Sequence, residues 1–182
     1  MRCRCAVLAC LLTGALVGAD EPFASGLKTG QRPMPYAFVM ATGPNRGTAH
    51  CYICETADKP AAVIFARKLT DPLGTLAAKV DQAVADAKVP DFRGWLTLLD
   101  DGKSPNAEKA LVTWGQKHAL RHVPLGVFED PVGPPAYRLH KAAEVTVVLF
   151  VKQKAVANFA FKAGELTDEK AAEVAKALDQ LK

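Results

Sequence analysis

The sequence predicts an α/β protein in which helices flank a central mixed β-sheet and an N-terminal β-hairpin extends that sheet. Two observations support this prediction. Short apolar runs of strand length alternate with stretches in which apolar residues recur every three or four positions, which is typical of strands followed by amphipathic helices. Near the C-terminus, apolar runs at residues 145–151 and 155–161 are separated by only three residues, which indicates an antiparallel hairpin.

The N-terminal hairpin is predicted from three consecutive segments. Residues 36–42 form an apolar run of strand length, residues 43–47 are a turn cluster rich in Gly, Pro and Asn, and residues 48–54 are expected to be the returning strand. Beyond the hairpin, strand and helix patterns alternate. The expected elements occupy residues 62–67 (strand), 71–88 (helix), 94–99 (strand), a helix opening at 104, 123–129 (strand), 145–151 and 155–161 (strands), and a helix from 167.

Two helix starts carry recognisable capping residues. Asp71 is expected at the N-cap of the first helix with Pro72 at the first helical position, and Thr167 is expected to cap the last helix with its hydroxyl. The resulting order places two helical crossovers between parallel strands, followed by an antiparallel hairpin and a closing helix.

This order resembles the thioredoxin-like superfamily. The best match is the C-terminal stretch EVTVVLFVKQKAVANFAFKAGELTDEKAAEVAKALDQL, which is similar to the family's closing hairpin, glycine and amphipathic helix. The extra N-terminal hairpin is similar to that of the peroxiredoxin-like and periplasmic thioredoxin-like members. The resemblance implies an exported bacterial thioredoxin-domain protein.

Two departures from the family pattern concern the redox motif. In redox-active members, a Cys-x-x-Cys pair lies at the end of the first core strand and opens the first helix, whereas residues 68–73 of this chain contain no cysteine. The family also places a cis-proline before the hairpin strand, and the corresponding position here is Val145, before Thr146. The resemblance therefore implies a thioredoxin-like protein whose catalytic motif is displaced or lost.

The first 19 residues have the three parts of a signal peptide. Arg2 and Arg4 give a positive start, residues 6–17 are apolar but too short to span a bilayer, and Val17 and Ala19 place small residues before the expected cleavage after Ala19. We therefore expect an exported protein, either periplasmic or secreted.

A lipoprotein signal is the alternative, because the residues ending at Cys10 loosely fit a lipobox. The expected organisation is a signal peptide at residues 1–19, an irregular arm rich in Pro and Gly at 20–35 and a thioredoxin-like domain at 36–182. After signal cleavage, we expect no membrane span.

The charge pattern gives no indication of a nucleic-acid partner. The formal net charge of +4 falls to +2 when Arg2 and Arg4 leave with the signal, and the remaining charges are mixed along the chain without a basic block.

Cysteine is the informative residue type. Only Cys51 and Cys54 of the five cysteines remain after signal removal, and an oxidising compartment favours their pairing. In a regular strand, residues three apart are separated by roughly 10 Å and point to opposite faces, whereas a disulfide needs α-carbons within about 7 Å. The pair can therefore bridge only if the chain turns between the two cysteines.

Four interpretations of the pair remain open at this stage. Cys51 and Cys54 are the candidate catalytic residues if they exchange between dithiol and disulfide with a protein thiol or disulfide partner. Alternatively, they form a static disulfide in a non-catalytic binding or scaffold domain, a metal site completed by His50 or another histidine, or two unpaired thiols.

No cofactor is expected. Covalent haem is disfavoured because the residue after Cys54 is Glu55, where c-type attachment needs histidine.

Overall fold

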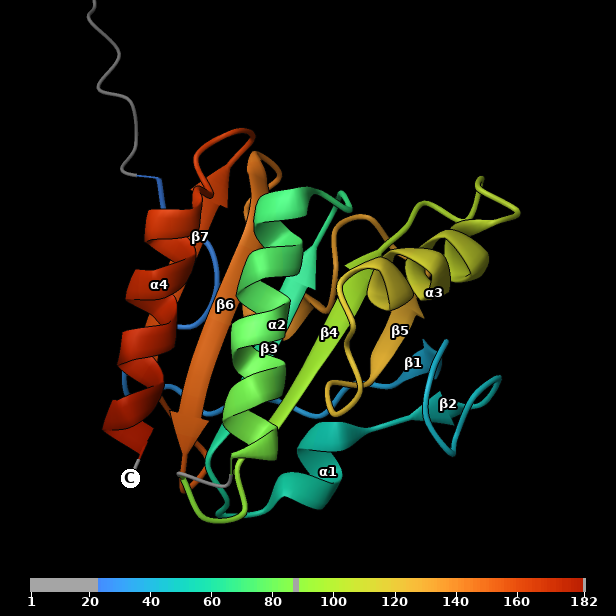
Figure 1. Ribbon diagram of the computed structural model, residues 1–182. Coiled ribbons are helices and arrows are strands. Elements are labelled where there is room, and N and C mark those ends of the chain that lie inside the picture. Colours follow the sequence, from blue (N-terminus) through green and yellow to red (C-terminus); the bar gives the residue numbers. More distant parts are fainter. Residues whose placement is uncertain (1–22, 87–88, 182) are drawn as a thin grey trace, which may run out of the picture.

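The computed structural model describes residues 23–86 and 89–181 (Figure 1). A seven-stranded mixed sheet runs through these residues in the order β2-β1-β5-β4-β3-β6-β7. The elements are β1 (Phe38–Met40), β2 (Ala49–His50), α1 (Tyr52–Thr56), β3 (Ala61–Ala66), α2 (Asp71–Ala85), β4 (Arg93–Leu99), α3 (Ala107–Lys117), β5 (Leu125–Phe128), η1 (Pro135–Tyr137), β6 (Ala143–Val151), β7 (Lys154–Lys162), α4 (Asp168–Ala177) and η2 (Leu178–Leu181). The expected signal peptide, residues 1–19, lies outside the described residues.

Strand β3 occupies the centre of the sheet. It pairs in parallel with β4 and antiparallel with β6, and all six of its residues are buried. A strand is apolar on both faces when both faces of its sheet are covered, which explains the continuous apolar run from Ala61 to Ala66. The mixed sheet flanked by helices confirms the fold class predicted from the sequence.

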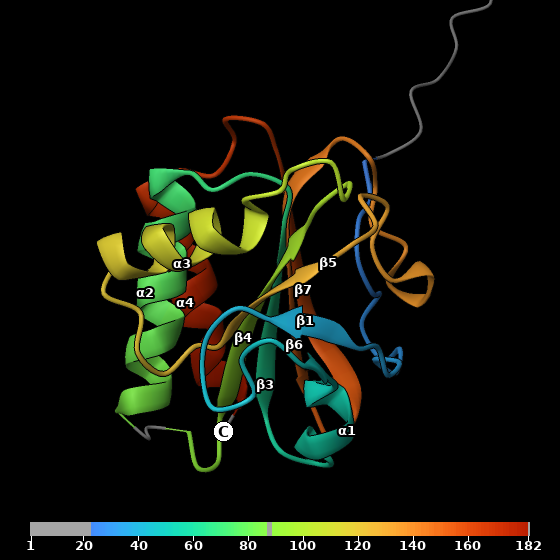
Figure 2. The ribbon, with the colours of Figure 1, turned by 90° about the vertical axis from the view of Figure 1, so that its right-hand side faces the viewer.

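One face of the sheet is covered by α2, α3 and α4, which lie together in Figure 2. Their apolar stripes supply Val80, Leu111 and Val174 to a core cluster that also contains Ile64 and Val147 from the sheet. This face follows directly from the helical periodicity in the sequence. No helix among the described residues is long and apolar enough to cross a membrane.

Two predicted helix starts differ from the structure. Thr70, not Asp71, is the N-cap of α2, because its hydroxyl accepts a hydrogen bond from the N–H of Leu73 at 3.3 Å. Helix α3 begins at Ala107 instead of residue 104. The cap of the last helix is confirmed, since the Thr167 hydroxyl accepts the N–H of Lys170 at 3.3 Å.

The other face of the sheet is aromatic. Tyr36, Phe65, Trp95, Tyr137 and Phe150 form the large side chains of a second buried cluster. Helix α1, η1 and the N-terminal arm lie over this face, on the side opposite to α2, α3 and α4 (Figure 2). The sheet therefore separates an aliphatic helical layer from an aromatic layer.

The N-terminal arm is fixed to the sheet by hydrogen bonds. The Ser25 and Thr146 hydroxyls lie 2.7 Å apart in a buried contact, and the N–H of Gly30 donates to the carbonyl of Ala155 at 2.7 Å. Gly26 has a φ of +92°, and a Cβ atom there would overlap the side chain of Asn158, so only glycine fits. The arm contributes to the wall of the aromatic layer.

Candidate redox site

The Cys51–Cys54 pair spans the start of α1, a five-residue helix between β2 and β3. Cys51 is its N-cap, and the Cys51 Sγ accepts a hydrogen bond from the N–H of Cys54 at 3.2 Å. Thr56 donates its hydroxyl to the carbonyl of Tyr52 at 2.7 Å, which stabilises the helical turn from the other end. The predicted returning strand at residues 48–54 is therefore wrong beyond His50, because Cys51 ends the strand and begins a helix.

The helical turn brings the two cysteines within bonding distance. Their α-carbons are 5.4 Å apart, and the two sulfur atoms are joined by a disulfide with an S–S distance of 2.10 Å. This separation is inside the limit of about 7 Å for a disulfide. The condition set by the sequence, a turn between Cys51 and Cys54, is fulfilled.

The two cysteines differ in their access to solvent. Cys54 is exposed and Cys51 is half-buried at the junction of strand and helix. A sulfur atom must be reached by a partner thiolate to take part in exchange. The Cys54 end of the pair is therefore the more exposed one.

Tyr52, between the two cysteines in the sequence, attaches α1 to the sheet. Its ring stacks on Trp95 with a centroid distance of 5.5 Å and an interplanar angle of 26°, and it also contacts Phe38 at 6.1 Å. Thr56 of the same helix is buried. These contacts attach α1 to the sheet in addition to the sulfur–sulfur bond.

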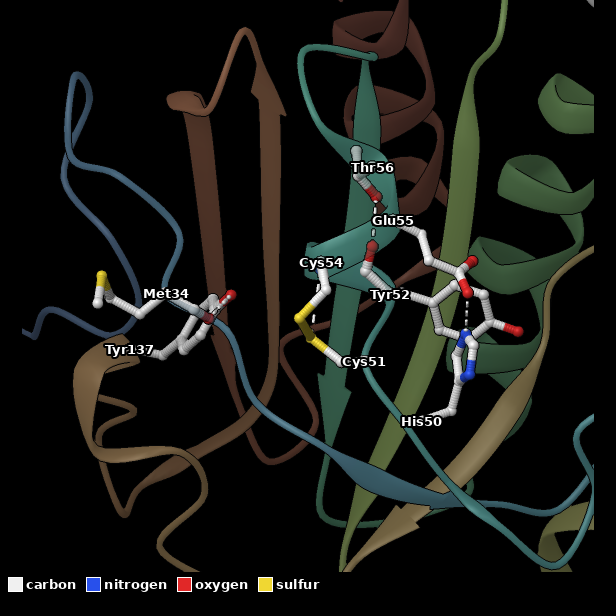
Figure 3. Close-up of a disulfide and its surroundings, with 8 residues drawn as sticks. All are labelled: Met34, His50, Cys51, Tyr52, Cys54, Glu55, Thr56 and Tyr137. Atoms are coloured by element: carbon white, nitrogen blue, oxygen red, sulfur yellow. Dashed lines mark hydrogen bonds and ion pairs between the residues drawn. A yellow bond between two sulfur atoms is a disulfide. The ribbon is translucent and has the colours of Figure 1, made fainter.

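Glu55 provides a polar attachment on the same helix. One carboxylate oxygen lies 3.3 Å from Nη1 of Arg93 on β4, and the other lies 3.1 Å from Nε2 of His50 (Figure 3). The other ring nitrogen of His50 lies 3.1 Å from the side-chain amide of Asn45. Glu55 and Arg93 also affect the pKa of Tyr52, which is raised first by burial and then by Glu55, with Arg93 opposing.

The geometry of His50 does not support the metal interpretation. The close-up shows its ring directed toward Glu55 and away from the two sulfur atoms (Figure 3). Within residues 23–86 and 89–181, no group of three or more His, Cys, Asp or Glu side chains converges on a possible ion position. A tetrahedral zinc site needs four such ligands.

A buried hydrogen-bond chain lies beneath Tyr52. The indole N–H of Trp95 donates to the hydroxyl oxygen of Tyr36 at 2.9 Å, and that hydroxyl lies 2.8 Å from the Thr97 hydroxyl. Burial raises the pKa of Tyr36 far above its ordinary value, so the phenol stays neutral. Because the polar atoms of this hydrogen-bond chain are paired with one another, the Trp95 side chain beneath α1 is held rigidly.

The position used by redox-active thioredoxin-like proteins lies at the other end of β3. There Thr70 caps α2, and its carbonyl accepts the indole N–H of Trp114 at 3.1 Å. In Figures 1 and 2, this helix start lies at the upper end of the sheet and α1 at the lower end. No cis peptide bond occurs among the described residues, including the bond before Val145. The absence of a cysteine at this end agrees with the sequence prediction of a displaced pair.

Sequence reasoning located the two cysteines but not the residues that support them. Tyr52, Arg93 and the pairing of Tyr36 with Trp95 were not identified. An aromatic residue inside a Cys-x-x-Cys motif was the one available signal, since a turn that joins the cysteines must direct the intervening side chains elsewhere.

Asp81 was also missed. Its carboxylate accepts the backbone N–H groups of Arg121, His122 and Val123 at 2.6–2.9 Å, and it contacts Nδ1 of His122 at 3.1 Å. Asp81 therefore joins α2 to the segment before β5, a structural role away from the cysteines.

No sequence-family model and no curated protein matches this chain. Solved structures do match it in fold. A candidate protein disulfide isomerase from Bacteroides thetaiotaomicron superimposes with a TM-score of 0.64 and 13% identity, covering 87% of this chain and 94% of the other.

Two further structures extend this similarity. A candidate thiol:disulfide interchange protein DsbE from Chlorobium tepidum gives a TM-score of 0.61 at 15% identity, covering 86% of this chain and 99% of the other. A secreted disulfide oxidoreductase from Mycobacterium tuberculosis gives 0.58 at 11% identity, covering 80% and 95%.

The fold is therefore thioredoxin-like, as the resemblance in the sequence implied. Within that class, this chain is similar in architecture to the DsbE-like structures, and it carries a Cys-x-x-Cys disulfide on α1. At these identities, the similarity defines the fold alone.

Proposed function

We propose that this protein exchanges thiols and disulfides with protein partners through Cys51 and Cys54. The observation that supports this most strongly is the combination of a formed disulfide and an exposed Cys54 on a helix held by other contacts. Because Tyr52 and Glu55 attach α1 to the sheet, the bond can open and close without release of the helix. Similar folds among candidate and established disulfide oxidoreductases support the same proposal.

We extend the proposal to the compartment in which the protein works. An amino-terminal signal at residues 1–19 would direct the arm at 20–35 and the domain at 36–182 out of the cytoplasm, where disulfides persist. The similar Mycobacterium tuberculosis structure is of a secreted protein. Amino-terminal sequencing of protein recovered from outside the cytoplasm of a bacterial host is expected to begin at Asp20.

An activity assay with matched variants tests the exchange proposal. Reduction of insulin disulfides by the protein, with dithiothreitol as electron donor, is expected to fall at least 100-fold in both Cys51→Ser and Cys54→Ser. Thr70→Ala, at the cysteine-free end of β3, is the control and is expected to retain activity. Equal activity in wild type and both cysteine variants would contradict the proposal.

A binding or scaffold domain is the second candidate function. It is favoured by the first turn of α2, where Thr70 stands in the region used by redox-active relatives of this fold. In that case, Cys51–Cys54 is a structural disulfide, and the insulin assay gives no cysteine-dependent turnover.

A further inference from the structure

We infer that Cys54 is the sulfur that forms the mixed disulfide with a partner, and that Cys51 is the internal sulfur that leaves or attacks within the protein. This inference rests on the proposed exchange function and assigns the two roles within it. The first observation is exposure, since Cys54 is exposed whereas Cys51 is half-buried.

Reaction geometry makes this difference important. A thiolate attacks a disulfide along the S–S axis, from the side opposite to the departing sulfur. An attack on Cys54 therefore approaches from the exposed end of the bond, whereas an attack on Cys51 approaches from the end where the chain passes from β2 into α1. A folded partner can reach the first position more easily than the second.

The second observation is the hydrogen bond at Cys51. Its Sγ accepts the N–H of Cys54 at 3.2 Å, and no hydrogen bond reaches the Cys54 Sγ from the residues that the structure describes. A hydrogen bond to a sulfur stabilises it more strongly as a thiolate than as a neutral atom. Cys51 is therefore the better leaving sulfur when the bond opens.

The exchange then follows two balanced steps. A partner thiolate attacks Cys54 Sγ, a new S–S bond joins the partner to Cys54, and Cys51 leaves with the electron pair of the broken bond as a thiolate. A second partner thiolate attacks the partner sulfur of this mixed disulfide, so that the partner leaves with its own disulfide and Cys54 leaves as a thiolate. The partner loses two electrons and the protein gains them, and reduction of a partner disulfide follows the same steps in reverse.

This assignment separates two properties that can belong to one cysteine. In general, the nucleophile of a redox pair is the sulfur that is exposed and is stabilised as a thiolate. In the structure, exposure belongs to Cys54 and the stabilising hydrogen bond belongs to Cys51. The residue that meets the partner is therefore the second cysteine of the motif.

Single-cysteine variants test the assignment. Cys51→Ser retains Cys54 and keeps a residue able to cap α1, and Cys54→Ser retains Cys51. Each reduced variant is mixed with insulin, and the mixed disulfide is followed by non-reducing electrophoresis and located by mass spectrometry. We expect Cys51→Ser to form this adduct at least tenfold faster than Cys54→Ser.

A small reagent provides the matched comparison. With dimethyl disulfide as the probe, the difference in the rate of adduct formation between the two variants is expected to shrink. A small molecule reaches the half-buried sulfur more easily than insulin does. Faster adduct formation at Cys51 than at Cys54 with insulin would overturn the assignment while leaving the exchange function intact. Absence of adducts in both variants, with circular dichroism showing both folded, would refute the exchange function itself.

A measurement on the reduced wild type covers the case in which a variant fails to fold. Brief exposure to glutathione disulfide followed by acid quenching is expected to place the glutathione adduct on Cys54. An adduct found mainly on Cys51 would overturn the assignment.

Discussion

Helices α1 and α2 begin at opposite ends of β3, and both have a side-chain N-cap, but the capping atom is a sulfur in α1 and a hydroxyl oxygen in α2. In each, the N-cap side chain accepts the N–H three residues further on: the Thr70 oxygen from Leu73, and the Cys51 sulfur from Cys54. A hydroxyl and a sulfur both cap a helix, but only the sulfur carries redox chemistry. The comparison shows that in this chain the fold's usual active-site position and its cysteine pair are separate features.

The two helices also differ in what holds them in place. Helix α2 has 15 residues and a buried apolar stripe that includes Leu73, Leu76 and Val80. Helix α1 has five residues, which is too short to be stable by itself. Its position depends on the stacking of Tyr52 on Trp95 and on the contacts of Glu55.

The largest expected effect comes from removal of the support beneath α1. Trp95 is fully buried, and Trp95→Ala is expected to lower the free energy of unfolding by about 3–5 kcal/mol, because it leaves a cavity and removes one of the two hydrogen-bond partners of the Tyr36 hydroxyl. Urea denaturation followed by circular dichroism measures the loss. A loss below about 1 kcal/mol would show that α1 does not depend on this support.

The next largest effect is expected from Asp81, which joins α2 to the segment before β5. Asp81→Ala removes the acceptor of three backbone N–H groups, and we expect a loss of about 2–3 kcal/mol. Asp81→Asn is the matched variant, since it keeps one oxygen acceptor and is expected to lose less. The same urea experiment measures both variants, and equal stability of Asp81→Ala and wild type would contradict the structural role.

Asp81 also gives a pH dependence of known sign. Burial alone raises the pKa of the carboxyl, but the hydrogen bonds from His122, Val123 and Arg121 outweigh it and hold the pKa below its ordinary value. The unfolded state therefore binds the proton more readily, and the contribution of Asp81 to stability is present above about pH 4 and is lost as the pH falls through the folded-state pKa. Stability measured from pH 6 to pH 2 is expected to fall less steeply in Asp81→Asn than in wild type.

Reduction of the disulfide is expected to have a smaller effect on stability. A ring closed over four residues contributes about 2 kcal/mol or less on chain-entropy grounds. Because Tyr52 and Glu55 hold α1 independently, the reduced protein is expected to keep its near-ultraviolet circular dichroism. Unfolding at 37 °C on addition of dithiothreitol would show that the disulfide is required to maintain the fold, and this would contradict the exchange proposal.

The smallest effect concerns the cap of α2. Thr70→Ala is expected to lower the free energy of unfolding by about 1 kcal/mol, because the N–H of Leu73 loses its acceptor. Thr70→Ser keeps the hydroxyl and is expected to restore most of that stability. Neither substitution is expected to change the rate of insulin reduction. A large loss of activity in Thr70→Ala would instead indicate that the active site lies at the start of α2, the position used by redox-active thioredoxin-like proteins.

The elements governed by local patterns were predicted well from the sequence. The buried run that became β3, the hairpin of β6 and β7 and the cap at Thr167 each follow from periodicity or capping within a few residues. The fold class followed from the order of these elements.

The site was less predictable because it depends on contacts between distant residues. The short run before β3 contains strand-forming residues, but the Cys51 cap and the Thr56 hydrogen bond stabilise it as a helix. The stacking of Tyr52 on Trp95 joins residues 43 positions apart, which no local pattern reveals. The different exposure of Cys51 and Cys54 follows from this arrangement.

The reduction potential of the Cys51–Cys54 disulfide tests the central claim most directly. It is measured by equilibrating the protein with glutathione or dithiothreitol redox buffers and counting free thiols after alkylation. A working exchange pair is expected to have a potential between about −270 and −120 mV, the range of thioredoxin-like oxidoreductases. A potential below about −300 mV, typical of structural disulfides, would contradict the account.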